Sequence, residues 1–149
     1  RWGIKSTGIN LYLPSVELAR ERAKANNLPA KFIHGDFRDY EKQHEAVVFF
    51  EILEHLPEPD KAIQKAFSLV KPGGRLYIST PRAGDSIGVI NHLSDTSRKP
   101  WSADDKPAGH LRLFTTEEMK ELIKDYTVTE FYVDTDKSFC IEIMKGGKK

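Results

Sequence analysis

Disulfides, membrane helices and an excess of charge are all missing from this sequence. Its one cysteine, Cys140, cannot form a disulfide within the chain, and such cysteine usage suits a reducing compartment, so we expect a cytoplasmic protein. No apolar run approaches the roughly 20 residues that a membrane helix requires, and no signal-peptide pattern opens the chain. The net charge of +1 creates no strong field. We therefore expect no membrane partner and do not expect nucleic acid.

The length and composition are those of one soluble domain. The 149 residues are 39% hydrophobic and 30% charged, an ordinary balance for a chain that buries a core. The chain opens on Arg1 rather than on methionine. We therefore expect the domain over residues 1–149 to be N-terminally incomplete.

A strand, a helix and a second strand are predicted between residues 45 and 81. Residues 46–50 form an unbroken apolar run, typical of a strand buried on both faces of a parallel sheet. Apolar side chains then recur at helical spacing, at Ile63, Ala66, Phe67 and Val70. Pro72-Gly73-Gly74 is expected to end this helix, and a second strand starts at Leu76. Such a unit joins two parallel strands by a helical crossover.

A similar unit precedes this one, and a hairpin follows it. We expect a short strand over residues 4–9, a helix over 14–26 and a strand over 31–34. Apolar runs at 127–133 and 139–144 are joined by four polar residues, which predicts an antiparallel hairpin. The predicted fold class is α/β: a Rossmann-like, doubly wound and mostly parallel sheet with a C-terminal antiparallel hairpin.

Between these parts lies a long irregular stretch. Residues 82–110 are rich in Gly, Ser, Asp, Asn and Pro, and a connection of this length in a compact domain is usually a lid or a binding loop. We expect a lid or substrate loop there. Thr115 and Glu118 then have the spacing of a capping box, which predicts the start of a helix.

Acidic and imidazole side chains gather where the strands are expected to end. Glu51, Glu54 and His55 follow the strand over residues 46–50, and Asp36 follows the strand over residues 31–34. In parallel α/β sheets, ligands bind beyond the carboxyl ends of the strands. We therefore expect these side chains to lie on the rim of one ligand crevice.

Three motifs together resemble the class I S-adenosylmethionine-dependent methyltransferases. They are Glu51-Ile-Leu-Glu-His-Leu-Pro, Val70-Lys-Pro-Gly-Gly-Arg-Leu and Ser79-Thr-Pro. Further stretches resemble the family's second strand, the loop after its third strand and the join to its late helix: Gly8-Ile-Asn, His34-Gly-Asp-Phe and Gly109-His-Leu-Arg-Leu-Phe-Thr. The likeness covers nearly the whole chain, in the family's order.

The chain departs from the family in two places. The family opens with a strand and a glycine-rich loop, but no Gly-x-Gly occurs here, so the resemblance implies that the first strand is absent. We expect a missing N-terminal segment or a second chain to complete the sheet. The family usually ends its second strand in an acidic residue that holds the ribose hydroxyls. Asn10 stands at that position, and an amide lacks the charge of a carboxylate.

The resemblance implies six cofactor-binding residues: Asn10, Leu11, Asp36, Phe37, Phe50 and Glu51. Asp36 would accept from the adenine amino group, beside the backbone of Phe37. Asn10 and Leu11 would lie along the ribose and adenine, and the backbone after the strand over residues 46–50 would line the methionine pocket. The alternative interpretation is that Asp36 is a turn aspartate that caps Asp39 and that Asn10 makes a turn after a strand.

The bend that carries Glu54 and His55 allows three interpretations. His55 is a general base that takes a proton from the acceptor. Alternatively, Glu51, Glu54 and His55, joined by His110, bind Mg or Mn, as Glu-x-x-Glu-His does in some methyltransferases of quinone precursors or RNA ends. In the third interpretation the bend caps the next helix and shapes the pocket floor. We assign catalytic roles to Glu54, His55 and His110 and keep the ion as an alternative.

The function implied by the resemblance is methyl transfer from S-adenosylmethionine to an oxygen, nitrogen or carbon atom of a small molecule, leaving S-adenosylhomocysteine. One alternative is an inactive methyltransferase-like binding or scaffold domain, which Asn10 and the missing glycine loop support. Another is a metal-assisted methyltransferase of RNA ends.

Overall fold

The computed structural model describes residues 3–83, 110–134 and 138–146, and these form two compact units. The first unit ends at Tyr40 and the second begins at Glu41. Most of the expected lid, residues 84–109, lies outside the described residues. Across the described ranges, no helix is both long enough and apolar enough to cross a membrane.

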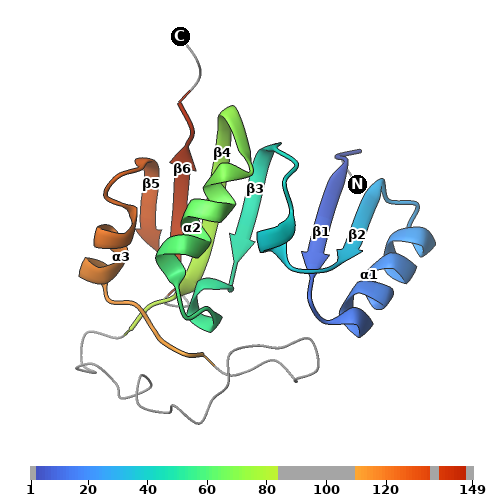
Figure 1. Cartoon of the computed structure of the whole chain (residues 1–149), viewed down its shortest axis with the longest axis horizontal. Coiled ribbons are helices and arrows are strands. Elements are labelled where there is room, and N and C mark those ends of the chain that lie inside the picture. Colours follow the sequence, from blue (N-terminus) through green and yellow to red (C-terminus); the bar gives the residue numbers. More distant parts are fainter. Residues whose placement is uncertain (1–2, 84–109, 135–137, 147–149) are drawn as a thin grey trace. The chain divides into compact units, whose positions relative to one another are not determined.

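The first unit contains two parallel strands joined by a helix (Figure 1). Its elements are β1 (Ser6–Asn10), α1 (Leu13–Ala25), β2 (Ala30–His34) and the 3-10 turn η1 (Phe37–Asp39). The register pairs Asn10 with His34, so the carboxyl ends of both strands lie at the same edge. Gly8 is required by packing, because a Cβ atom there would lie 2.8 Å from Cδ1 of Phe32.

Helix α1 is held to the strands by its buried face and by one arginine. Pro14 lies in the first turn as expected, where its missing N–H breaks no helical hydrogen bond. Val16 and Ala23 are buried on one side of the helix. Arg20 donates from Nε and Nη2 to the carbonyl oxygen of Phe32, at 3.1 and 2.9 Å, which ties α1 to β2.

The second unit is built on a four-stranded sheet in the order β3-β4-β6-β5 (Figure 1). Its elements are β3 (His44–Phe50), the 3-10 turn η2 (Leu53–His55), α2 (Pro59–Ser68), β4 (Val70–Pro81), α3 (Thr116–Ile123), β5 (Thr127–Val133) and β6 (Ser138–Met144). Strands β3 and β4 are parallel, whereas β5 and β6 form the expected antiparallel hairpin. The predicted α/β class and its C-terminal hairpin are confirmed.

The core of the second unit lies on one face of this sheet. Alternate side chains of β4 and β6 are buried together with apolar residues of α2 and α3: Leu76, Ile78, Phe139, Ile141, Ile143, Ile63, Ala66, Met119 and Ile123. In β3, Phe49 is buried, whereas its neighbours Val48 and Phe50 are 58% and 53% exposed. The predicted burial of this strand on both faces is therefore wrong for the described residues.

Helix α2 ends earlier than its apolar pattern predicts. It stops at Ser68, and Val70 instead begins β4, where it is fully buried opposite His44. The prediction failed because a single buried apolar residue fits both the spacing of a helix and the alternation of a strand. Pro72-Gly73-Gly74 thus lies inside the strand: Gly73 takes φ 81°, and a Cβ on Gly74 would lie 2.5 Å from the carbonyl oxygen of Glu45.

Four strand edges lack a partner among the described residues, one each on β1, β2, β3 and β5. There, β1 pairs with β2 only, and β3 pairs with β4 only. Each of these strands therefore presents a row of backbone groups that no described strand satisfies. This pairing is consistent with the expected absence of a first strand, and completion of the sheet by another segment or chain stays a prediction.

Lys145 caps the C-terminal end of α2. Its Nζ donates to the carbonyl oxygens of Phe67, Ser68 and Val70, at 3.1, 3.4 and 2.7 Å, and lies 5.1 Å from the centroid of the Phe67 ring. Carbonyls at the end of a helix have no partner within the helix, and a cation there also opposes the helix dipole. One side chain after β6 therefore fixes the join between α2 and β4.

We expect Lys145→Met to lower the free energy of unfolding by about 1–2 kcal/mol, because several carbonyls lose a charged donor while the aliphatic stem is kept. Chemical denaturation followed by circular dichroism measures the change. Lys71→Met is the matched control, since Lys71 belongs to an exposed pair 3.8 Å from Glu45 and should stay within about 0.5 kcal/mol. Equal losses in both variants would contradict the capping role.

Candidate functional site

In the first unit, the residues after β1 and β2 are joined by hydrogen bonds. The N–H of Gly35 donates to the carbonyl oxygen of Asn10 at 3.0 Å, and Nε2 of His34 donates to that of Leu11 at 2.9 Å. These bonds hold the turn after β1 against the loop that carries Asp36. Asn10, Leu11, Asp36 and Phe37 are thus brought to one edge of the unit.

Asp36 accepts hydrogen bonds on both carboxylate oxygens from Arg38. Nε of Arg38 lies 2.9 Å from each oxygen, Nη2 also contacts Oδ2, and the backbone N–H donates to Oδ1 at 2.8 Å. These hydrogen bonds hold the pKa of Asp36 below its usual value, although partial burial opposes the shift. The carboxylate is therefore ionised at neutral pH and caps η1. Its role toward adenine stays a prediction.

Asn10 forms a local turn in the structure. Its Oδ1 accepts from the backbone N–H of Tyr12 at 2.7 Å, just before α1 begins. The amide oxygen is thereby engaged by the chain itself, and the amide nitrogen is the group suited to donate to a ligand. A ribose contact through Asn10 stays a prediction.

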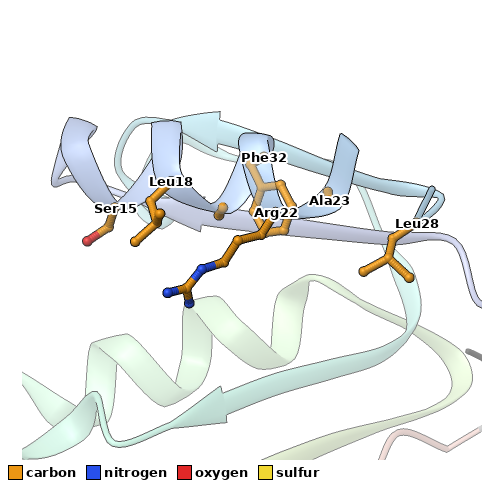
Figure 2. A pocket seen from close by; sticks show the side chains of 7 residues that line it. Ser15, Leu18, Arg22, Ala23, Leu28 and Phe32 are labelled. Carbon is orange, nitrogen blue, oxygen red and sulfur yellow. The ribbon is translucent and has the colours of Figure 1, made fainter. Parts of the chain in front are cut away.

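The first unit carries a groove of about 370 Å³, whose lining side chains are drawn in Figure 2. It is lined by Ser15, Leu18, Ala19, Arg22, Ala23, Leu28 and Phe32, from α1, β2 and the turn between them. None of the predicted cofactor-binding or catalytic residues lines it.

In the second unit, Glu51 has an unusual backbone conformation directly after β3. Its φ is 53°, in the left-handed region that non-glycine residues rarely adopt. Its N–H donates to the carbonyl oxygen of Ser79 at 2.9 Å, and Oγ of Ser79 donates to Oε1 of Glu51 at 2.7 Å. These bonds turn the chain sharply at the strand end and direct it into η2.

Glu54 is a fully buried acid in that turn. The residue is 0% exposed, and its Oε2 accepts from Oγ1 of Thr80 at 2.8 Å. Its Oε1 is buried with no hydrogen-bond partner among the described residues. Burying a carboxylate oxygen without a donor is costly, so a ligand or an ion at Oε1 would remove the penalty.

Two histidines approach this oxygen from different parts of the chain. Nε2 of His55 lies 3.7 Å from Oε1 of Glu54, and Nε2 of His110 lies 4.0 Å from it. The two imidazoles meet edge to face with ring centroids 5.2 Å apart. The structure thus brings together the three residues predicted to be catalytic, whereas Glu51 is engaged with Ser79.

Backbone hydrogen bonds carry His110 to this position. The N–H groups of Leu111 and Arg112 donate to the carbonyl oxygen of Glu54, at 2.7 and 3.3 Å. The guanidinium of Arg112 donates from Nη2 to the carbonyl oxygen of Pro57 at 3.0 Å. The segment that precedes α3 is therefore fixed to the bend after β3.

Sequence reasoning missed Thr80 as part of the site. It lies on the buried side of β4, in phase with Leu76 and Ile78, and is 0% exposed. A hydroxyl at an apolar position of a strand requires a buried acceptor, and that acceptor is Glu54. A hydroxyl at a buried position in the alternation of β4 was the signal for Thr80. Its partner Glu54, however, lies 26 residues away in the sequence.

Glu54, His55 and His110 could hold a divalent ion. One ligand atom from each lies within 4.8 Å of the others. Ligands of an ion at bond lengths near 2.0–2.2 Å are separated by roughly 3–4 Å, so small side-chain movements would suffice. The unpartnered oxygen of Glu54 supports this fit. These ligands are one carboxylate and two imidazoles. Glu51, which the predicted ion site also included, is not among them.

A model of the family described as "Methyltransferase domain" matches residues 1–127 of this chain. A ubiquinone biosynthesis O-methyltransferase of Proteus mirabilis is 30% identical over 84 residues, which are 54% of this chain and 34% of that relative. The match thus spans about a third of the length of the curated relative.

Solved structures agree on the fold. A SAM-dependent methyltransferase from Methanosarcina mazei has a TM-score of 0.73 at 20% identity, covering 96% of this chain and 83% of that one. Magnesium protoporphyrin IX methyltransferase from Synechocystis PCC 6803, solved with bound S-adenosylhomocysteine, gives 0.67 at 14% identity, covering 94% and 64%. At these identities the likeness concerns the fold.

We expect Glu51→Gly to be more stable than Glu51→Ala by about 1 kcal/mol, because glycine adopts φ 53° without strain. Both variants lose the same carboxylate, so their difference isolates the Cβ atom. Urea unfolding of the pair measures it. In ordinary extended backbone alanine would be the more stable residue, so that order would show that Glu51 does not adopt the left-handed conformation in solution.

Proposed function

Because this chain belongs to the methyltransferase domain family, among the class I S-adenosylmethionine-dependent methyltransferases that its motifs resemble, we propose that it binds S-adenosylmethionine and transfers the methyl group to a small molecule. The carrying observation is the ionised Asp36 at the carboxyl end of a parallel strand, in the loop that the resemblance assigns to adenine. A carboxylate there accepts strongly from an exocyclic amino group.

The proposed acceptor is an oxygen atom of a small molecule. The curated relative is named as an O-methyltransferase, which favours oxygen over nitrogen and carbon. A hydroxyl acceptor keeps its proton at neutral pH and therefore needs a base, unlike a free amine. Of the two imidazoles beside Glu54, that of His55 is the more shielded, with 27% of its side chain exposed against 46% for His110.

In the proposed reaction, this chain orients the reactants and removes one proton. The sulfonium methyl is already activated, so holding the acceptor oxygen in line with it at near-attack distance supplies much of the rate. His55 takes the hydroxyl proton as a general base. The buried carboxylate of Glu54 stabilises the imidazolium that forms, since Oε1 lies 3.7 Å from Nε2.

Calorimetric titration with S-adenosylhomocysteine tests the cofactor site. We expect binding, and Asp36→Asn should weaken it by about 1–3 kcal/mol because a neutral amide replaces the charged acceptor. Asp39→Asn is the matched control: Asp39 is an exposed aspartate in the same turn and should bind as the unaltered chain does.

Two outcomes would contradict the assignment. No heat from the unaltered chain at millimolar ligand would support the alternative of an inactive binding or scaffold domain. Binding that is identical in both aspartate variants would keep cofactor binding but remove Asp36 from it.

As an alternative to His55 acting as the base, we propose that Glu54, His55 and His110 bind a divalent ion. The unpartnered, buried oxygen of Glu54 and the two nearby imidazoles support the proposal. A bound divalent ion would polarise the acceptor hydroxyl as a Lewis acid. The same carboxylate and imidazoles would then orient the acceptor.

We expect Mn²⁺ to stabilise the chain against thermal unfolding, by about 2.7 kcal/mol at a free ion concentration of 100 times Kd. Glu54→Gln should abolish the effect because an amide oxygen is a weaker ligand, whereas Glu58→Gln should keep it. Glu58 is the matched control since it pairs with Lys61 on the surface. Stabilisation that survives Glu54→Gln would contradict ion binding by these three residues, and so would no stabilisation of the unaltered chain. Either result would leave His55 as the base.

A further inference from the structure

We propose that Arg38 is a positioning residue for the cofactor: its guanidinium fixes the carboxylate of Asp36 in the orientation that receives the adenine amino group. The inference rests on the proposed function, because it takes Asp36 as the adenine acceptor. It assigns to Arg38 a role that acts through Asp36 and not by contact with the ligand.

The contacts define the orientation of the carboxylate. Nε of Arg38 is shared between Oδ1 and Oδ2 at 2.9 Å each, and Nη2 contacts Oδ2, which is the paired geometry of a guanidinium on a carboxylate. The backbone N–H of Arg38 adds a third donor at 2.8 Å from Oδ1. Three N–H groups of Arg38, in four contacts, thus fix both oxygens of the carboxylate.

Exposure separates the two partners. The side chain of Asp36 is 16% exposed, whereas that of Arg38 is 62% exposed. An ion pair with so exposed a partner is screened by water and contributes little to stability. The pair therefore has its main consequence in geometry, by restricting a carboxylate that would otherwise rotate about its side-chain bonds.

The local backbone also fixes Arg38 relative to Asp36. Both belong to η1 or its cap, and the N–H of Asp39 donates to the carbonyl oxygen of Asp36 at 3.2 Å. The side chain of Arg38 thus returns to a residue only two positions earlier. The same guanidinium also lowers the pKa of Asp36, which favours the charged form of the acceptor.

A double-mutant cycle tests the inference by titration calorimetry with S-adenosylhomocysteine. Arg38→Gln should weaken binding about tenfold, the loss of one well-aligned hydrogen bond to a charged acceptor. In an Asp36→Asn background, Arg38→Gln should cause no further loss, because the residue that Arg38 positions is already changed. Arg22→Gln, the same change at an exposed site on α1, is the matched control and should bind normally.

Two further measurements exclude a merely structural role. S-inosylhomocysteine carries an oxygen in place of the purine amino group, so Arg38→Gln should not weaken its binding. Arg38→Lys keeps the charge but not the paired donors and should show an intermediate loss for the adenosyl ligand. Circular dichroism on each variant checks the fold, and the lysine variant serves if the glutamine variant unfolds.

The outcomes separate this inference from the proposed function. If Asp36→Asn binds as tightly as the unaltered chain, the positioning role is overturned while cofactor binding stands. The positioning role is also overturned if Arg38→Gln weakens binding equally with and without Asp36. Tighter binding by Arg38→Gln would overturn it as well, because Arg38 would then block the carboxylate. No binding by the unaltered chain overturns both proposals.

Discussion

Burial of the Glu54 carboxylate is the constraint on which the site in the second unit depends. A buried acid is tolerated only where donors or charges compensate for its lost hydration. Thr80 supplies a donor to Oε2, and the N–H groups of Leu111 and Arg112 bind the carbonyl oxygen of the same residue. One residue therefore fastens the turn after β3 to β4 and to the segment before α3. His55 and His110 meet because these separate segments are fixed at a common point.

Much of this fold follows from local sequence rules. The hairpin of β5 and β6 and the capping box at Thr115 are where the sequence predicts them, because both depend on residues close together in the chain. The end of α2 could not be predicted in the same way. Val70 leaves the helix because it pairs with His44, and Gly74 is needed because the Glu45 carbonyl approaches closely. Both reasons are contacts between distant residues, which periodicity does not register.

In the candidate site, too, residue types were predictable from the sequence, whereas contacts between distant residues were not. The sequence identified Glu54 and His55 by type and by position at a strand end, and His110 by type in the segment before a predicted helix, and the structure brings the three together. It did not identify Thr80, since a hydroxyl in an apolar strand names no partner by itself. Nor did it indicate that Glu51 would be turned by a left-handed backbone toward Ser79 and away from the ion-binding set considered at first. Such choices arise between side chains that the fold brings together, after the elements have formed.

The acids at the two strand ends differ in how their charge is balanced. Asp36 is matched by Arg38, so its loop presents a charged acceptor with little net charge, which suits a neutral purine. Glu51 and Glu54 form no ion pair with lysine or arginine in the described part of the chain. The two acids therefore differ toward a cation: Asp36 already has one in Arg38, whereas Oε1 of Glu54 has no hydrogen-bond partner among the described residues.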